Sequence, residues 1–117
     1  MSTRDVGRAG EEIAAKYLEK QGAAIIARNF TVRGGEIDLI AEKDDIVHFV
    51  EVKLRNNLAF GRGAEAVTKE KQRRICRAAV RFLAQRGWQE RFCRFDVIEI
   101  CPPDELRYIE RAFNYVK

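Results

Sequence analysis

The sequence predicts a single α/β domain over residues 1–117, with a mixed β-sheet flanked by helices. Two observations carry this prediction. Segments with the apolar spacing of helices and short runs rich in Val, Ile, Leu and Phe follow one another in the order α-β-β-β-α-β-β. The chain is also long enough for only one core, and no repeat, low-complexity stretch or linker divides it.

The first element is a helix, predicted from an N-cap at Asp5 to Gln21 and closed by Gly22. On a helical wheel, Glu11 lies at the edge of the apolar stripe and Glu12 points nearly opposite to it. Glu11 is therefore expected to reach inward while Glu12 stays in water. The stripe itself comprises Ala9, Ile13, Ala14, Tyr17 and Leu18.

Three strands are predicted next, the first over 23–27. The second covers 35–40 and the third covers 49–55, with Asp44 and Asp45 between them. A two-residue loop at these aspartates places Asp38 opposite Glu51. A four-residue loop would instead pair Asp38 with Phe49 and Glu36 with Glu51, and the sequence leaves both registers open.

The second and third strands carry a cluster of charged residues on one face, whichever register holds. Side chains alternate along a strand, so Glu36, Asp38, Glu51 and Lys53 all point to one side of the hairpin. Neighbouring carboxylates raise each other's pKa or recruit a cation, and oxygen ligands suit Mg²⁺ or Mn²⁺. The alternative is the solvated polar face of an ordinary hairpin; the apolar Phe49 on the same face argues against it.

The second helix is predicted to begin at about Ala64 or Thr68 and to end at Arg86, before Gly87. One face carries basic residues at a spacing of four, which either contact phosphates or are merely solvated. These residues are Arg73, Arg77 and Arg81. The buried stripe on the other side comprises Ile75, Cys76, Ala79, Phe82 and Leu83.

The last third of the chain adds a strand over 94–100 and a further strand or short helix over 106–115. Asp96 is expected to be a structural acid paired to an arginine. The only histidine, His48, falls on the face opposite Glu51, where a packed or hydrogen-bonded role is expected.

Composition excludes several classes of protein. Three cysteines in no metal-binding or disulfide pattern indicate reduced thiols, and no phosphate-binding glycine loop occurs. No apolar run reaches membrane-spanning length and no leader is present, so a cytoplasmic location without a membrane partner is expected. The 22 basic and 18 acidic residues give a net charge of +4, which alone would not single out nucleic acid.

Ordered motifs give the sequence a recognisable family pattern. Glu51 and Lys53 form the E-x-K that, after Asp38, resembles the PD-(D/E)xK motif of restriction-endonuclease-like nucleases. With GxAGEE, RNF, GGEIDLIA and AVTKEKQ, the chain resembles the bacterial YraN-type (UPF0102) family from Gly7 to Phe113. That family is similar in fold to archaeal Holliday-junction resolvases. One departure is Ile37, which stands where the motif has proline.

The resemblance implies a restriction-endonuclease-like fold and a metal-dependent DNA endonuclease, with branched DNA as one candidate substrate. Asp38 and Glu51 would bind Mg²⁺ or Mn²⁺, and Lys53 would orient the attacking water or neutralise charge in the transition state. Glu11 matches a third acidic ligand, although an exposed helix acid is its alternative. Gln72 would be a polar active-site residue. Resolvase-like relatives act as dimers, so a homodimer is expected.

Several basic residues are expected to contact nucleic acid. Arg55 and Arg62 belong to a glycine-bearing loop, which is either a flap over a nucleic-acid backbone or a plain connector. Lys71 lies at the edge of the apolar stripe of the second helix, and the resemblance places it near the active site with Gln72. Two alternatives to an enzyme remain: a non-catalytic nucleic-acid-binding or adaptor module, and a structural protein whose charges form an ion-pair network.

Overall fold

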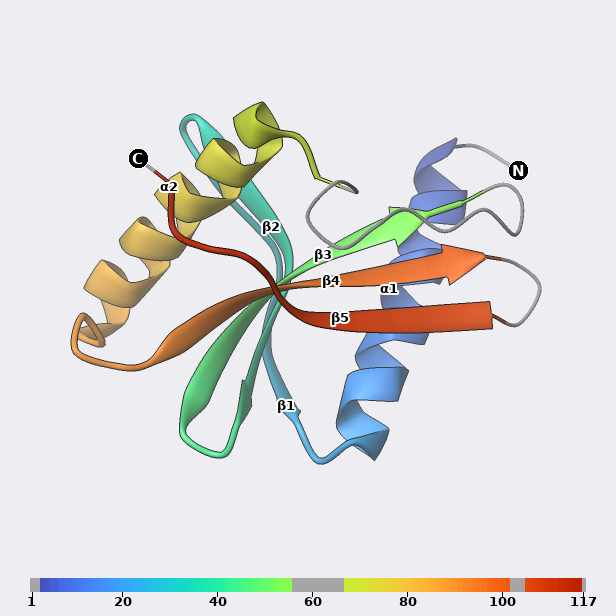
Figure 1. The fold of residues 1–117 in the computed structure, drawn as a ribbon, viewed down its shortest axis with the longest axis horizontal. Coiled ribbons are helices and arrows are strands. Elements are labelled where there is room, and N and C mark those ends of the chain that lie inside the picture. Colours follow the sequence, from blue (N-terminus) through green and yellow to red (C-terminus); the bar gives the residue numbers. More distant parts are fainter. Residues whose placement is uncertain (1–2, 56–66, 102–104, 117) are drawn as a thin grey trace.

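A five-stranded mixed sheet with one helix on each side forms the fold in the computed structural model, which describes residues 3–55, 67–101 and 105–116 (Figure 1). The strands lie in the order β1-β2-β3-β4-β5; β3 and β4 are parallel and the other neighbours antiparallel. The predicted α/β class is confirmed. The elements are α1 (Thr3–Lys20), β1 (Ala24–Val32), β2 (Gly35–Lys43), β3 (Ile46–Leu54), α2 (Lys69–Arg86), β4 (Cys93–Cys101) and β5 (Glu105–Phe113).

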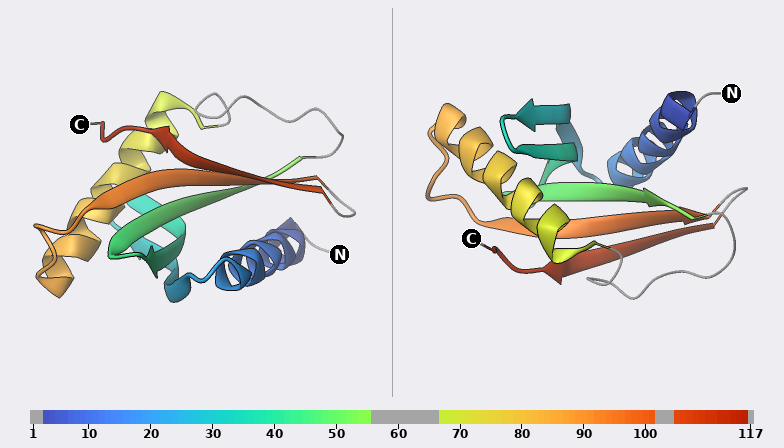
Figure 2. Two further views of the ribbon diagram at one scale, coloured as in Figure 1. Left: turned by 60° about the horizontal axis from the view of Figure 1, so that its bottom comes forward. Right: turned by 90° about the horizontal axis from the view of Figure 1, so that it is seen from above.

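Two hydrophobic clusters hold the helices to the sheet. The larger lies under α2, where Phe49, Phe82 and Phe95 pack together with aromatic rings about 6 Å apart. The smaller lies under α1, around Leu39 and Val50. Figure 2 shows the two helices at different ends of the sheet, with the strands between them. No helix among the described residues is long and apolar enough to cross a membrane.

The first helix differs from its prediction in two ways. It begins at Thr3, so Asp5 lies inside the helix and the predicted N-cap is wrong. Its buried stripe is also rotated, because Ile13 is 47% exposed while Ala15 is fully buried. The reason is close packing at Gly10, where an added Cβ would lie 3.0 Å from a Leu54 methyl carbon. Small residues therefore face the sheet.

The sequence left open where α2 begins and whether the segment near the C-terminus is a strand or a helix, and the structure answers both questions. Thr68 is the N-cap of α2, since its Oγ1 accepts a hydrogen bond from the Lys71 N–H at 3.1 Å. Gly87 ends the helix in the left-handed conformation, with φ of 69°. The segment near the C-terminus is a strand, not a helix, and pairs antiparallel with β4.

The β2–β3 turn confirms the two-residue register. Asp44 and Asp45 adopt φ values of 53° and 65°, as a type I′ turn requires of both central residues. Aspartate tolerates this left-handed region better than most residues without being glycine. Pairing then runs from Lys43 opposite Ile46 to Leu39 opposite Val50. The two-residue loop was the correct alternative.

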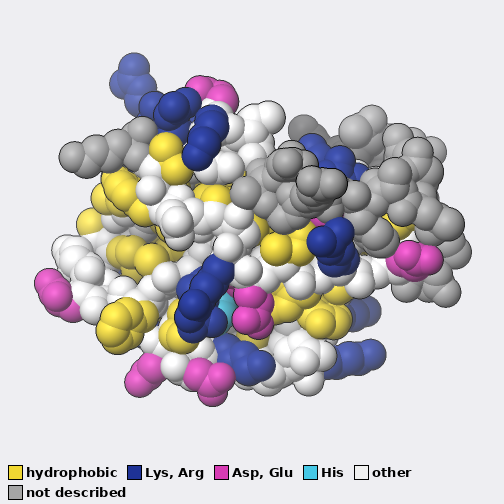
Figure 3. Space-filling model, in the orientation of Figure 1, with side chains coloured by type: hydrophobic (Ala, Val, Ile, Leu, Met, Phe, Trp, Pro, Cys, Tyr) yellow, Lys and Arg dark blue, Asp and Glu magenta, His cyan; other side chains and the backbone are white. Residues whose placement is uncertain are grey.

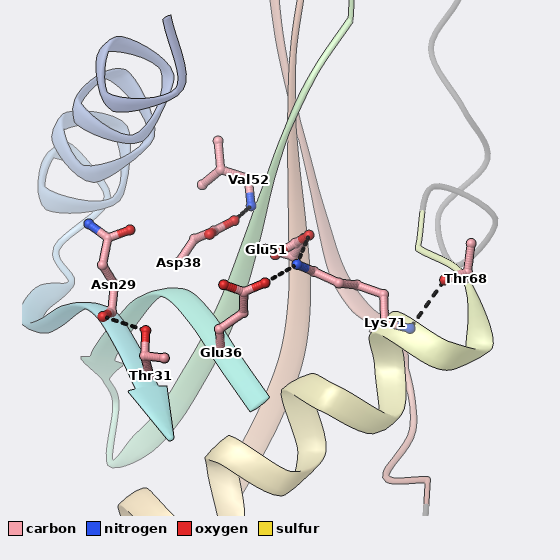
Figure 4. Close-up of polar contacts among 8 residues, drawn as sticks. All are labelled: Asn29, Thr31, Glu36, Asp38, Glu51, Val52, Thr68 and Lys71. Atoms are coloured by element: carbon pink, nitrogen blue, oxygen red, sulfur yellow. Dashed lines mark hydrogen bonds and ion pairs between the residues drawn. The ribbon is translucent and has the colours of Figure 1, made fainter. Parts of the chain in front are cut away.

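The predicted side-chain alternation fails beyond that point, because β2 turns away from β3 (Figures 1 and 4). The N–H of Val52 donates instead to Oδ2 of Asp38, at 2.8 Å. Ile37 and Ile40 both pack on the α2 side, while Leu39 packs on the α1 side. Asp38 therefore lies at a break in β2. There its carboxylate, in place of a backbone carbonyl, accepts the hydrogen bond from the N–H of Val52.

Asp96 has a different partner from the one predicted. Its Oδ2 lies 2.7 Å from Nδ1 of His48 and accepts a hydrogen bond from the Tyr108 hydroxyl at 2.6 Å. Its Oδ1 accepts from the backbone N–H of Arg111 at 2.9 Å. No arginine side chain among the described residues pairs with it. The parallel register of β3 and β4 explains the contact between His48 and Asp96. It places His48 beside Arg94, and Asp96 lies two residues farther along β4 on the same face.

Candidate functional site

Three carboxylates and one ammonium meet where β2 and β3 diverge (Figure 4). Glu36 and Asp38 come from β2, Glu51 from β3, and Lys71 from the first turn of α2. The Lys71 Nζ lies 3.0 Å from Glu36 Oε1 and 3.6 Å from Glu51 Oε2. We call these four residues the acidic cluster.

The start of β2 is held against α2 by Gly35. A Cβ at this position would lie 2.4 Å from the carbonyl oxygen of Arg74, so no larger residue fits without moving the helix. This close approach brings Glu36, the next residue, within reach of Lys71. The Thr68 cap fixes the first turn of α2 and thereby places Lys71 opposite the two strands.

Glu51 is the most perturbed member of the acidic cluster. It is 8% exposed, and its Oε1 has no hydrogen-bond partner among the described residues. Burial, followed by the negative charge of Asp38, raises the pKa of Glu51 to about 9, and Lys71 only partly opposes this. Without a further cation, Glu51 therefore holds a proton at neutral pH.

The pKa values of Glu36 and Lys71 are also shifted, because the acidic cluster holds more carboxylates than ammonium groups. Hydrogen bonding to Lys71 lowers the pKa of Glu36 below its ordinary value. Burial would lower the pKa of Lys71, but the carboxylates of Glu51 and Glu36 raise it instead. Within the described part of the chain, three acids thus share one ammonium, and a buried oxygen of Glu51 is left without a hydrogen-bond partner. This donor set fits a hard divalent cation.

A cation here would need ligands beyond the protein. Within residues 3–55, 67–101 and 105–116, no three His, Cys, Asp or Glu side chains are grouped closely enough to enclose a metal ion. One carboxylate oxygen of Asp38 also accepts a hydrogen bond from the Val52 N–H. Water and substrate oxygens would therefore complete the coordination, as is usual for Mg²⁺.

Glu11 on α1 is half-buried and lies near enough to Asp38 to be affected by its charge, in keeping with the inward position expected from the helical wheel. Burial and the negative charge of Asp38 raise its pKa above the ordinary value, while Asn29 and Arg28 oppose the rise. Glu11 and Asn29 also line a hollow of about 510 Å³. Glu12 stays on the outside, where it pairs with Arg28 at 2.8 Å.

Lys53 does not lie among the carboxylates. Its side chain is exposed, and its neighbour on β4 is Glu99. Among the described residues, no ion pair joins Lys53 to Glu36, Asp38 or Glu51. Lys71 holds the position that the sequence had suggested for Lys53 as counter-ion, because the divergence of β2 opens the cluster toward α2.

The family model for the uncharacterised protein family UPF0102 matches residues 10–100, a span that contains Glu11 and the whole acidic cluster. This chain belongs to the UPF0102 family. A UPF0102 protein of Symbiobacterium thermophilum is 48% identical over 116 residues, which cover 96% of this chain and 98% of that protein. One of Myxococcus xanthus is 45% identical over 114 residues, covering 95% of this chain and 90% of that protein.

A solved structure shares the fold of this UPF0102 chain. It is Hjc of Archaeoglobus fulgidus, a Holliday junction resolvase, with a TM-score of 0.56 and 19% sequence identity. The match covers 89% of this chain and 71% of Hjc. The restriction-endonuclease-like fold that the sequence motifs implied is therefore confirmed.

Gln72 lies on a different side of α2 from Lys71, since successive helical residues are about 100° apart. In this UPF0102 chain its Nε2 donates to the Val67 carbonyl oxygen at 3.0 Å. Gln72 is 3% exposed, and its Oε1 has no hydrogen-bond partner among the described residues. It lines a hollow with Tyr115 near the C-terminus.

The basic residues expected to contact nucleic acid differ in how exposed they are and in their protein partners. Arg77 and Arg81 are exposed on α2, and Nη1 of Arg77 donates to the Gly34 carbonyl at 3.3 Å. Arg73 is half-buried. The guanidinium of Arg55 is engaged by buried Glu99, with Nε 3.0 Å from Oε2, which was not foreseen. Arg62 lies outside the described residues.

Proposed function

We propose that this UPF0102 chain is a metal-dependent endonuclease that hydrolyses phosphodiester bonds in DNA. The observation that carries the proposal is Glu51, a buried carboxylate beside Asp38 with one oxygen that has no hydrogen-bond partner among the described residues. An acid is stable in such a place only when it is protonated or paired with a cation. The shared fold with Hjc, a Holliday junction resolvase, supports DNA as the substrate and branched DNA as its first candidate form.

The chain's acids have the chemistry to hold Mg²⁺ or Mn²⁺. Asp38 and Glu51 would be the principal ligands, with Glu11 as the third acid. When bound, the ion supplies Lewis-acid chemistry and a lowered pKa for coordinated water. Glu51 must release its proton before it can bind a cation, so its raised pKa couples cation binding to pH.

The two lysines then have separate roles. In the absence of a metal ion, Lys71 pairs with Glu36 at 3.0 Å and lies 3.6 Å from the protonated Glu51. Once a metal ion binds the Glu51 carboxylate, Lys71 would be available to a substrate phosphate. Lys53 is exposed at the same end of β3, where its long stem can reach the scissile phosphate and neutralise charge in the transition state. In a homodimer, a second copy would offer the same groups to the opposite strand.

A cleavage assay tests the proposal. Labelled four-way junction, linear duplex and single-stranded DNA are incubated with the wild type and with Asp38→Asn, with and without Mn²⁺. We expect Mn²⁺-dependent cleavage by the wild type and a loss of at least about a hundredfold in the variant. DNA binding by both proteins without cleavage by either would instead support the non-catalytic module.

Replacing Arg73, Arg77 and Arg81 by Ala should weaken DNA binding and flatten its dependence on salt. Each lost phosphate contact reduces the slope of log K against log salt by about 0.9 for duplex DNA. Fluorescence anisotropy in EDTA over a salt series measures this slope. The charge-matched control replaces Lys16, Lys20 and Lys43, and equal slopes for the two triple variants would show that the arginine face is only solvated.

A further inference from the structure

We propose that a groove beside the N-terminus of α2 binds an unpaired nucleobase of the substrate strand. This inference rests on the proposed function and extends it to the form of the substrate. The groove has a volume of about 550 Å³ and lies between the start of α2 and the C-terminal segment. We call it the C-terminal groove, lined by Lys69, Gln72, Phe113, Asn114 and Tyr115 among others.

Gln72 lines the C-terminal groove and carries a buried amide oxygen that accepts no hydrogen bond from the part of the chain that the structure describes. Its Nε2 is fixed by the Val67 carbonyl at 3.0 Å, which sets the orientation of the amide and leaves Oε1 without a hydrogen-bond partner among the described residues. Because Gln72 is 97% buried, an unpartnered amide oxygen is costly there. This oxygen is itself buried, so an N–H donor on the edge of a base would satisfy it once the Gln72 amide turns toward the groove, and every unpaired base offers such a donor.

Aromatic side chains give the groove a surface for stacking. Tyr115 is 55% exposed and lies next to Phe113 at the wall. A second hollow, of about 610 Å³, shares Phe113 and Tyr115 and continues to Phe92, which is 81% exposed, and to Arg94. In Figure 3, hydrophobic side chains gather where the C-terminal segment passes α2, with Lys and Arg side chains near them. Aromatic rings beside cations are typical of single-stranded nucleic-acid sites.

The charge at the groove suits a phosphate. Lys69 lines the groove, whereas Lys71 pairs with Glu36 at the acidic cluster, so Lys69 is the cation of this turn that a phosphate in the groove would meet. The positive end of the helix dipole points the same way and adds to the attraction for an anion. A nucleotide would thus place its base between Gln72 and Tyr115 and its phosphate toward Lys69.

The groove is coupled to the acidic cluster through α2. Lys71, which contacts Glu51, and Gln72, which lines the groove, are consecutive residues. Because the two residues face different sides of α2, a strand held by its base in the groove would have to pass the N-terminus of α2 to reach the acidic cluster. A paired base has its N–H donors and its ring face covered, so only an unpaired nucleotide near the cleavage point can use this site.

Abasic substitution tests the inference. A labelled single-stranded DNA and the same oligonucleotide with abasic residues are titrated against the full chain in EDTA, so that no cleavage is required. The variants are Tyr115→Ala and Lys69→Ala, with Lys20→Ala on α1 as the charge-matched control. We expect abasic residues and Tyr115→Ala each to weaken binding about 5- to 50-fold and not to add when combined.

Each other result has a defined meaning. Equal affinity of the wild type for intact and abasic strands would overturn the inference, even if metal-dependent cleavage were found. Conversely, loss of cleavage in Asp38→Asn with this binding pattern kept would leave the groove in place. If Tyr115→Ala abolished self-association of the protein but left both oligonucleotides bound equally, the groove would be a protein interface and the inference would fail. An RNA strand in parallel shows whether the sugar matters.

Discussion

Replacing Glu51 by Gln should make the metal-free protein more stable at pH 8 and abolish its stabilisation by Mn²⁺. The pKa of Glu51 is about 9 in the folded protein and ordinary when unfolded, so the folded state holds the extra proton between these values. The stabilisation that protonated Glu51 contributes to the folded state is fully present below about pH 4.5, and it is lost as the pH rises toward 9. Gln removes this loss, which is on the order of 5 kcal/mol at pH 8.

Chemical denaturation at pH 5 and pH 8, with and without Mn²⁺, measures both effects. The wild type should lose stability between these pH values in EDTA and regain it with Mn²⁺, by about 2.7 kcal/mol at a concentration a hundred times Kd. Glu51→Gln should show neither change. The matched control is Glu19→Gln on the exposed side of α1. If Glu51→Gln behaves like this control, the carboxylate is not strained and the metal assignment loses its basis.

Replacing Lys53 by Ala should lower cleavage by about 10²- to 10³-fold without changing the melting temperature. The exposed Lys53 makes no ion pair with the carboxylates among the described residues, so its loss leaves no buried charge uncovered. Lys71→Ala should differ, because it removes the ammonium beside Glu36 and Glu51. We expect it to lower stability by about 1 kcal/mol in EDTA, since the pair is partly exposed, and to be rescued by Mg²⁺.

Thermal melts in EDTA and in Mg²⁺, beside the cleavage assay, separate the two lysines. Lys20→Ala, at the far end of α1, controls for the loss of one positive charge. Full cleavage by Lys53→Ala together with loss of cleavage in Lys71→Ala would move the catalytic role from the strand to the helix. A fall in melting temperature for Lys53→Ala alone would show that Lys53, and not Lys71, is the counter-ion.

Local signals in the sequence were enough to predict most of the fold. The aspartate pair at 44–45 located the β2–β3 turn but left its register open, and Gly87 marked the end of α2 while its start stayed open between Ala64 and Thr68. These signals are local because turns and caps depend on a few neighbouring residues. The position of Glu11 also followed from helical periodicity. The rotated stripe of α1 did not, since it depends on the contact of Gly10 with Leu54, far along the chain.

The parts of the site that sequence did not predict depend on tertiary contacts. The divergence of β2 at Asp38 requires its hydrogen bond to Val52, which no alternation pattern contains. The contact of Lys71 with Glu36 joins residues 35 positions apart and follows from the packing of Gly35 on α2. Neither feature leaves a periodic signal in the chain.

Calorimetric titration of Mn²⁺ is the measurement that tests the central claim most directly. The wild type, Asp38→Asn and the control Asp44→Asn are titrated at pH 8; the control makes the same chemical change at the exposed turn. The account predicts binding by the wild type and by Asp44→Asn, with proton release from Glu51, and a loss of at least about tenfold in affinity for Asp38→Asn. Equal affinity in all three proteins would contradict a metal site at Asp38 and Glu51.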